Sequence, residues 1–280
     1  MHSPQQLNRR SFLGAALATP ALVALLAACA SDNKTGSGGI SHASGRDDQL
    51  VRIGFEGGFT APSYQFTRVP TLLISGDARV IVPGAQTEQF PGPLLPALFE
   101  RSITEAGIQK VLELADAATL LQPPPDYTAP MNVADAPDTV VVLSANGQTY
   151  KHAAYALGMG EPEVTPARKA LSGFVTAMGD IDKVAGAANL GEGKPYVADS
   201  YRMQARALTP TDVSGIEPAP QIVAWPTGTG VLLTTASTCV VVPAARVDAV
   251  FKTATQTTFF TEDGVTYEVA AVAKLPGDVC

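Results

Sequence analysis

The chain has 280 residues, of which 16% are charged, and its 26 acidic and 19 basic residues give a formal net charge of −7. This acidic balance, without any stripe of basic residues interleaved with aromatics, argues against nucleic-acid binding and against electrostatic attachment to anionic lipid. Apart from Cys29, the chain has only two cysteines, Cys239 and Cys280, which are distant in sequence and offer too few ligands for a metal, and we expect neither a metal nor a cofactor.

Residues 1–28 are expected to be an export signal. Arg9 and Arg10 precede an apolar stretch that is rich in alanine and interrupted by Gly14 and Pro20. A membrane-spanning helix needs about 20 predominantly apolar residues, and this stretch is shorter and milder. A basic start, an apolar middle and small residues at the end are typical of a cleaved signal peptide, with a buried helix as the alternative.

The signal contains a pattern that resembles the twin-arginine export motif. The central positions match in Arg9, Arg10, Phe12 and Leu13, whereas the flanking positions of the motif do not. The mild apolar stretch also suits that route. An ordinary secretory signal that carries paired arginines is the alternative.

The end of the signal resembles the bacterial lipobox, in Leu26, Ala27, Ala28 and Cys29. In that motif the small residues admit the peptidase, and the cysteine thiol takes a diacylglyceryl group and becomes the new N-terminus. Each buried acyl CH₂ contributes roughly 0.8 kcal/mol, so two or three chains hold a protein at a membrane. We therefore expect an exported protein, anchored by its lipid to the outer face of the cell membrane. A chance cysteine at a cleavage site is the alternative.

The composition of the remaining chain suggests a tether and two lobes. Residues 29–49 contain almost no large apolar side chain, which predicts a flexible tether that carries the lipidated cysteine. The folded part is then divided at the glycine-containing stretch 191–195. We expect one lobe at 50–188 and a second lobe at 189–280.

The first lobe should begin with a strand at residues 51–58. A hairpin is expected next, with arms at 64–75 and 78–82 and a turn at Gly76-Asp77.

Two helices are expected later in this lobe. Ser102 and Glu105 have the spacing of a capping box, which predicts a helix that ends near Leu121. Thr165 and Pro166 have the residue types of a helix cap and first position, which predicts a second helix that ends by residue 186.

Two dipeptides, Asn146-Gly147 and Asp263-Gly264, predict tight β-hairpins, since these residues favour two-residue turns. The expected cross-strand pairs are Leu143 with Tyr150, Val141 with His152, and Phe260 with Tyr267.

The second lobe is expected to be mostly extended chain. The extended segments are 196–208, 221–225 and 230–242. A helix at 243–253 should direct Val247 and Val250 inward.

Hairpins with few helices predict an α+β fold, in which antiparallel hairpin-rich sheets pack with a few helices. The pattern is unlike a periplasmic solute-binding fold, which needs parallel strands alternating with helices. Residues 80–83 (VIVP) and 240–243 (VVVP) each precede a predicted helix, and both hairpin turns lead into a Gly-x-Thr-Tyr sequence. The two lobes could therefore be a related pair, unless turn chemistry simply recurs.

Cys239 and Cys280 are expected to form a disulfide, because lipid would occupy Cys29 and the compartment is oxidising. The bond would tie down a C-terminal strand that otherwise frays. The Cα atoms of the two cysteines should lie about 4.4–6.8 Å apart. A pair of free thiols is the alternative.

No familiar nucleophile, zinc, redox or phosphate-binding motif is present in the predicted lobes, so we predict no catalytic residue. The candidates for carboxylate chemistry are Asp126, Asp135 and Asp138, and His152 is the one histidine of the predicted lobes. Tyr127 and Trp225 are the candidates for an aromatic surface on which a ligand could stack. For each of them, an ordinary structural or solvent-exposed role was the stronger interpretation.

Residues 68–155 resemble a domain of unknown function found in bacterial lipoproteins, in the segments SITEAGIQKVLELA, Asp126-Tyr127 and DAPDTVVVLSANGQTY. Residues 239–280 are similar to the tails of exported, uncharacterised lipoproteins. The resemblance implies an envelope location and a fold, but no activity and no site residue.

Two functional classes follow. The first is a non-enzymatic lipoprotein that binds an envelope protein or a small ligand. The alternative is an extracytoplasmic hydrolase that uses carboxylates.

Overall fold

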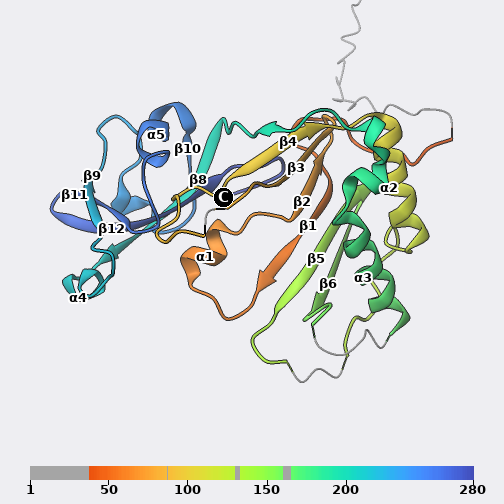
Figure 1. Ribbon diagram of the computed structural model, residues 1–280, viewed down its shortest axis with the longest axis horizontal. Helices are drawn as coiled ribbons and strands as arrows, with labels where there is room; N and C mark the ends of the chain where they lie inside the picture. The colour runs from red at the N-terminus through yellow and green to blue at the C-terminus, as the bar shows by residue number, and fades with distance from the viewer. Residues whose placement is uncertain (1–37, 87, 130–132, 160–164) are drawn as a thin grey trace, which may run out of the picture. The chain divides into compact units, whose positions relative to one another are not determined.

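Two mainly antiparallel β-sheets, of seven and five strands, organise the described part of the chain (Figure 1). The structure is a computed structural model that describes residues 38–86, 88–129, 133–159 and 165–280. The predicted export signal, its twin-arginine motif and the lipobox cysteine Cys29 lie outside the described residues. Sheets and helices of this kind confirm the predicted α+β fold class.

The first sheet has the strand order β6-β5-β1-β2-β3-β4-β7, with every neighbouring pair antiparallel. Its strands are β1 (Gln49–Gly57), β2 (Leu72–Ser75), β3 (Arg79–Pro83), β4 (Leu98–Ser102), β5 (Pro137–Ala145), β6 (Gln148–Tyr155) and β7 (Lys194–Pro195). Helices α2 (Glu105–Ala117) and α3 (Pro166–Met178) cover one face of this sheet, and a π-helical turn (Asp182–Gly186) and a 3-10 turn (Ala187–Asn189) follow α3 (Figure 1).

The second sheet has the order β10-β8-β12-β11-β9, in which only β9 and β11 are parallel. Its strands are β8 (Ser200–Leu208), β9 (Gln221–Ala224), β10 (Val240–Pro243), β11 (Thr258–Glu262) and β12 (Val265–Ala273). Its helices are α4 (Pro210–Val213), a 3-10 turn (Leu233–Thr235) and α5 (Ala244–Phe251). Helix α1 (Pro62–Thr67), from the first half of the chain, contacts β12.

Both predicted hairpin registers are confirmed. Strands β5 and β6 pair Leu143 with Tyr150 and Val141 with His152, and β11 and β12 pair Phe260 with Tyr267. Asn146, Gly147, Asp263 and Gly264 all have positive φ, between 50° and 77°. This backbone conformation is the one that a two-residue turn between twisted strands requires, and these residue types tolerate it.

The cap of α2 differs from the prediction. Thr104, not Ser102, caps the helix, and its hydroxyl accepts a hydrogen bond from Gly107 N at 3.2 Å. Ser102 is the last residue of β4, where it pairs with Arg79. The sheet pairing therefore holds Ser102 in extended backbone and moves the start of the helix by two residues. The α3 cap at Thr165 is as predicted.

Two predicted strands are shorter than expected. Residues 62–67 form α1, so the first arm of the β2–β3 hairpin is only Leu72–Ser75. Pro62 at the first helical turn starts that helix. The run 230–242 is mostly turns, and only its end belongs to β10.

The segment before β1 is not a flexible tether along its whole length. Ile40 packs against the first core, and its backbone N–H and C=O form hydrogen bonds with the Gln109 side chain at 2.8 and 2.9 Å. His42 is buried and contacts the Glu105 carboxylate at 3.0 Å, and Asn146 N donates to Ser41 O. The predicted tether is therefore wrong for residues 39–48, because α2 and the hairpin turn satisfy their polar groups. We call residues 39–48 the strap.

Two hydrophobic cores lie on opposite faces of the β2–β3 hairpin. Leu72, Ile74 and Val80 belong to the core beneath α2 and α3. Leu73 and Ile81 belong to the core formed with the second sheet and α5. A strand pair buried on both faces reads as a continuous apolar run, which is what this sequence has.

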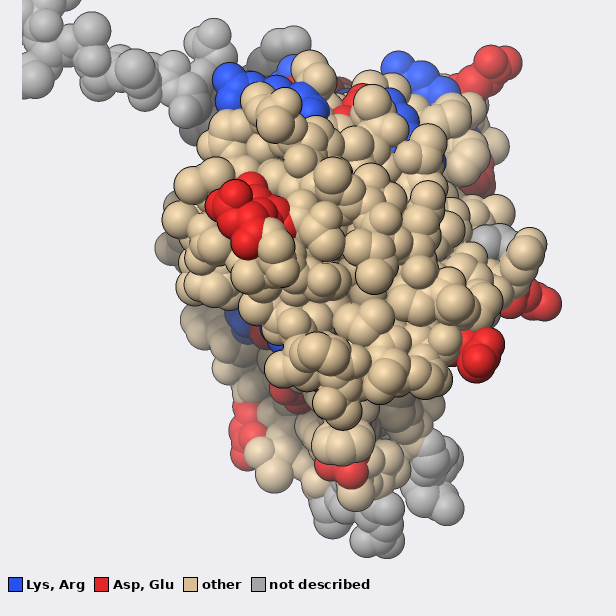
Figure 2. Space-filling view, turned by 90° about the vertical axis from the view of Figure 1, so that its left-hand side faces the viewer, with Lys and Arg blue, Asp and Glu red and all other residues tan. Residues whose placement is uncertain are grey.

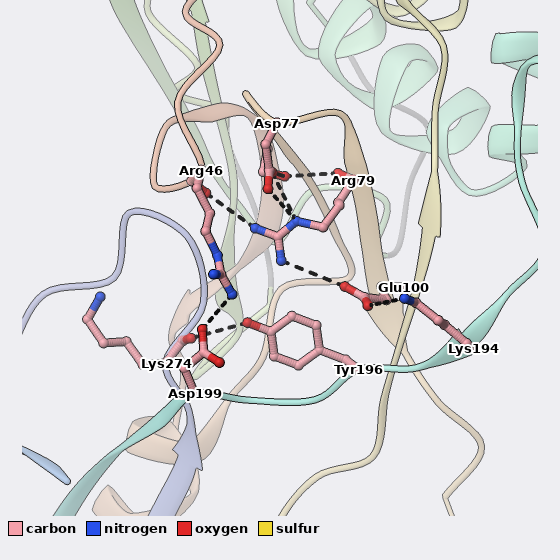
Figure 3. A network of polar contacts seen from close by, with 9 residues as sticks. Arg46, Asp77, Arg79, Glu100, Lys194, Tyr196, Asp199 and Lys274 are labelled. Carbon is pink, nitrogen blue, oxygen red and sulfur yellow. Dashed lines mark hydrogen bonds and ion pairs between the residues drawn. The ribbon is translucent and has the colours of Figure 1, made fainter. Parts of the chain in front are cut away.

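A polar network lies where the chain passes from the first sheet to the second, between β7 and β8 (Figure 3). Arg79 lies between Asp77, at 2.9 Å, and Glu100, at 3.7 Å, and Lys194 lies 3.3 Å from Glu100. Arg46 of the strap pairs with Asp199, which directly precedes β8. The Tyr196 hydroxyl donates to Lys274 O at 3.4 Å, so residues from both sheets meet here.

The two predicted lobes correspond only in part to the two sheets. Lys194 and Pro195, assigned to the second lobe, form the edge strand β7 of the first sheet. The positions of the two hairpins also differ, because β6 of the β5–β6 hairpin is an edge strand, whereas β11 and β12 both lie inside the second sheet. The arrangement of strands therefore gives no support to the internal repeat.

The C-terminal tail fastens one sheet to the other. Asp278 is almost fully buried and contacts Arg52 of β1 at 3.1 Å and Arg202 of β8 at 3.3 Å. Cys280 forms the expected disulfide with Cys239, which lies just before β10, and their Cα atoms are 5.1 Å apart. Figure 1 places the C-terminus between the two sheets.

Loss of the disulfide should destabilise the fold. The bond spans 41 positions, and constraining a loop of this size in the unfolded chain is worth about 4 kcal/mol. We expect Cys280→Ser to lower the free energy of unfolding by about 2–4 kcal/mol in urea titrations. Reduction of the wild type should produce a similar loss and leave the variant unchanged. Equal stability of variant and wild type would show that the tail needs no covalent tie.

Candidate functional site

The aspartates considered for hydrolysis do not form a catalytic pair. Asp126 is exposed, and its pKa is lowered by hydrogen bonds from the Thr128 side chain and from Thr128 N, which donates to the carboxylate at 2.8 Å. Asp135 is exposed beside β5, and Asp138 is half-buried within it. None of the three lines either of the two surface hollows considered below. Among the described residues, no three histidine, cysteine or acidic side chains are placed to hold a metal ion.

One hollow of about 620 Å³ lies between α2 and the chain at the end of α3. Its two carboxylates, Glu113 and Asp180, are exposed, and Lys110 and Lys183 line the same hollow. A general acid needs a carboxyl group whose surroundings disfavour ionisation. Exposed carboxylates beside lysines lack those surroundings, so this hollow does not support the hydrolase alternative.

His152 is fully buried and has a structural environment. Its Nε2 lies 2.8 Å from Leu120 O, and its Nδ1 lies 2.8 Å from the Tyr127 hydroxyl. A carbonyl only accepts, so Nε2 carries the hydrogen and Nδ1 accepts from Tyr127. Burial lowers the pKa of His152 and raises the pKa of Tyr127 to about 12, so both groups are neutral near pH 7.

Arg168 completes this buried group, and nothing in the sequence singled it out. It lies in the first turn of α3 and is fully buried. Its guanidinium donates to Tyr127 O and to Tyr155 O, each at 3.1 Å. These bonds tie the loop before β5 to the end of β6. His152, Tyr127 and Arg168 therefore hold the fold together rather than facing a ligand.

Acid should weaken this buried group. Because the pKa of His152 in the fold lies below its ordinary value of 6.5, the unfolded chain binds a proton first as the pH falls. The stabilisation is therefore complete above about pH 6.5 and declines below it, by at most ~1.4 kcal/mol per pH unit, until the folded-state pKa is reached. Urea titrations at pH 7.5 and 5.5 should show a smaller pH-dependent loss for His152→Asn than for wild type. Equal losses would contradict this role of His152.

Trp225 is also structural. It is buried, its ring lies 5.4 Å from that of Phe260 and 6.1 Å from that of Phe251, and its indole N–H donates to Val231 O at 2.9 Å. Neither Trp225 nor Tyr127 presents a face for stacking on a ligand.

The end of the second sheet carries a surface almost without charge. Residues 218–245 contain no Asp, Glu, Lys or Arg, although 16% of the chain is charged. Ile222 and Leu232 within this stretch are 52% and 58% exposed. Figure 2 shows uncharged side chains over most of this side of the molecule, apart from one acidic group and charges near its margins. Because β9 and β10 are opposite edges of the sheet, we call only β9 (Gln221–Ala224) together with Val265 the neutral face.

A hollow and an open strand edge give the neutral face its shape. Ile222 and Val265 line a hollow of about 580 Å³ beside α4. Strand β9 is the edge of its sheet, where Gln221 N donates to Thr257 O, just before β11, and Trp225 N donates to Thr261 O of β11. Because backbone groups alternate along a strand, the N–H and C=O groups of residues 222 and 224 point outward. The neutral face thus combines apolar side chains with uncharged hydrogen-bonding groups.

The comparisons with known proteins returned no family model, curated protein or solved structure that matches this chain. The resemblance to exported lipoproteins therefore stays a prediction. Within the described residues, each helix is too short or too polar to cross a bilayer.

Proposed function

We propose that this protein is a lipid-anchored, non-enzymatic binding protein of the cell envelope, held to the membrane through Cys29. The neutral face is the observation that carries the proposal of binding. Its exposed apolar side chains and open strand edge are the features by which a protein recognises another uncharged surface.

The partner proposed for the neutral face is an envelope protein with an uncharged surface. Partners usually meet through surfaces of complementary charge, and a face without charge selects one that also lacks it. Anionic lipid would instead require lysine or arginine, which residues 218–245 do not contain.

The lipid anchor is proposed from the sequence of the signal. The agreement of a basic start, a mild apolar stretch and LAAC at residues 26–29 supports it. The hydrolase alternative lacks support of this kind, since the described hollows bring no buried carboxylates together.

The anchor can be tested by fractionation. Cys29→Ala should abolish acylation and move the protein from the membrane to the soluble fraction, because the acyl chains provide the attachment. Detergent phase partitioning of cell extracts would measure this. A Cys29→Ala protein that still partitions with membranes would contradict the proposed anchor.

The neutral face can be tested by crosslinking in intact cells. A photoreactive amino acid at Val265 should give a protein adduct, and Ile222→Asp should remove it by burying a charge in the contact. The matched controls are a photoreactive residue at the exposed Lys169 of α3, which should give no adduct, and Lys169→Asp, which should leave the Val265 adduct intact. An adduct unaffected by Ile222→Asp would exclude the neutral face as the contact.

A further inference from the structure

The loop after β1 presents Phe59, the most exposed large apolar side chain among the described residues, at 87% exposure. A phenylalanine in water forgoes about 1.5–3 kcal/mol that burial would supply. A flexible loop could reduce this loss by folding the ring against the protein. The surroundings of Phe59 show why it does not.

Two side chains from α1 and its end hold the loop in one conformation. Arg68 donates to Phe55 O at 3.3 Å, to Gly57 O at 3.0 Å and to the hydroxyl of Thr60 at 3.4 Å. Gln65 donates to Gly58 O and Thr60 O, at 3.3 and 3.2 Å. The Arg68 guanidinium and the Gln65 amide therefore hold the carbonyl groups of the loop in place. The backbone that carries the Phe59 ring therefore has little conformational freedom left to lose when a partner binds.

The backbone of the loop reinforces this presentation. Gly57 and Gly58 have φ of +67° and +82°, a conformation that favours glycine. A Cβ on Gly58 would also lie 3.3 Å from Pro137 N. Phe59 N donates to Asp135 O at 3.1 Å, which joins the loop to the chain before β5.

Other exposed apolar side chains lie at the same end of the first sheet. Phe55 lies two residues before the end of β1, and Tyr155 is the last residue of β6. Tyr64 of α1 lies beneath the Arg68 guanidinium, whose central carbon is 5.3 Å from the ring centre. All three rings are more than one-third exposed. Rigid aromatic side chains are the residues that dominate protein–protein binding energy.

This end of the sheet is remote from the point where the chain enters the described structure. The strap contacts the β5–β6 turn through Ser41 and Asn146, whereas Phe59 contacts Asp135 at the opposite end of β5. At about 3.3 Å per residue, the nine residues of β5 separate these ends by roughly 30 Å. Figure 1 shows the strap and the loop after β1 at opposite ends of β5. The strap, at the other end of β5, therefore does not cover Phe59.

The charges near Phe59 are mainly acidic. Glu56 lies opposite Asp138 in the sheet and pairs with Lys151 at 2.9 Å. Among the described residues, Asp135 and Asp138 form no ion pair. Two free carboxylates beside an aromatic anchor disfavour anionic lipid and favour a surface with basic groups.

We propose that Phe59 is the anchor of a second protein-binding surface, and that its partner is an envelope protein with an apolar pocket for the ring and lysine or arginine at the rim of that pocket. The choice of a protein over anionic lipid rests on the carboxylates of Asp135 and Asp138, and only the location of that protein in the envelope rests on the proposed lipid anchor. The geometry of the loop does not depend on that anchor.

The proposal can be tested with p-benzoylphenylalanine, a photoreactive aromatic residue, at position 59 in intact cells. The crosslinked protein is identified, purified and titrated against the soluble Cys29→Ala chain. Phe59→Ala should weaken binding about 30-fold or more, as expected for an anchor worth 2 kcal/mol or more. Phe90→Ala, at a 61% exposed phenylalanine in another loop, is the matched control and should change affinity less than twofold. Asp135→Asn with Asp138→Asn should slow association and reduce its dependence on salt.

Several results would overturn the proposal. They are the absence of a protein adduct at position 59, an identified protein that binds Phe59→Ala as tightly as wild type, and Phe59-dependent dimers of this chain in sedimentation. Phe59-dependent binding to vesicles of phosphatidylglycerol and phosphatidylethanolamine would assign the ring to the bilayer instead. A failure of the lipid anchor would appear in the Cys29→Ala fractionation, whereas the Phe59→Ala titration would still report on this surface.

Discussion

The fold depends on one strand pair that is buried on both faces. The β2–β3 hairpin sends Leu72, Ile74 and Val80 into one core, and Leu73 and Ile81 into the other. Neither core is complete without it, because each core uses one face of this hairpin as part of its wall. A polar substitution on either face of the hairpin would place an unsatisfied group in an apolar interior. The hairpin therefore couples the stability of the two halves of the molecule.

The ends of the described chain reinforce this coupling from outside. The strap lies against α2 and reaches the second sheet through Arg46 and Asp199, while the tail brings Asp278 between Arg52 and Arg202. A buried carboxylate is costly unless cations and hydrogen bonds compensate it, and here two arginines from different sheets do so. The disulfide keeps that carboxylate in place by fixing the last residue of the chain.

The polar groups inside this protein serve its structure, and its exposed apolar groups are the basis for the functional proposals. His152 and Arg168 are buried and bonded to backbone carbonyls, so they have no free atoms to offer a substrate. The neutral face and Phe59 are the reverse case, since exposed apolar groups gain free energy only when another surface covers them. Their separation, at the end of the second sheet and at one end of the first, is compatible with two partners at once.

The sequence by itself determined the features that depend on neighbouring residues. Asn146-Gly147 and Asp263-Gly264 set two hairpins and their registers, because only a few residue types tolerate positive φ at both turn positions. The Cys239–Cys280 pair also followed from counting the cysteines of a chain that was expected to be exported. Apolar periodicity predicted helices that contain α2, α3 and α5, but it predicted neither α1 nor α4.

Tertiary structure decided whatever depends on contacts between distant segments. Ser102 and Thr104 are both good cap residues, and only the pairing of Ser102 in β4 excluded it from the cap. The strap has a disordered composition, yet α2 supplies partners for its polar groups from more than 60 positions away. Phe59 resembles any loop phenylalanine in the sequence, and its exposure follows from the bonds of Arg68 and Gln65. Such contacts leave no local pattern, because their free energy arises only when the chain has already brought the partners together.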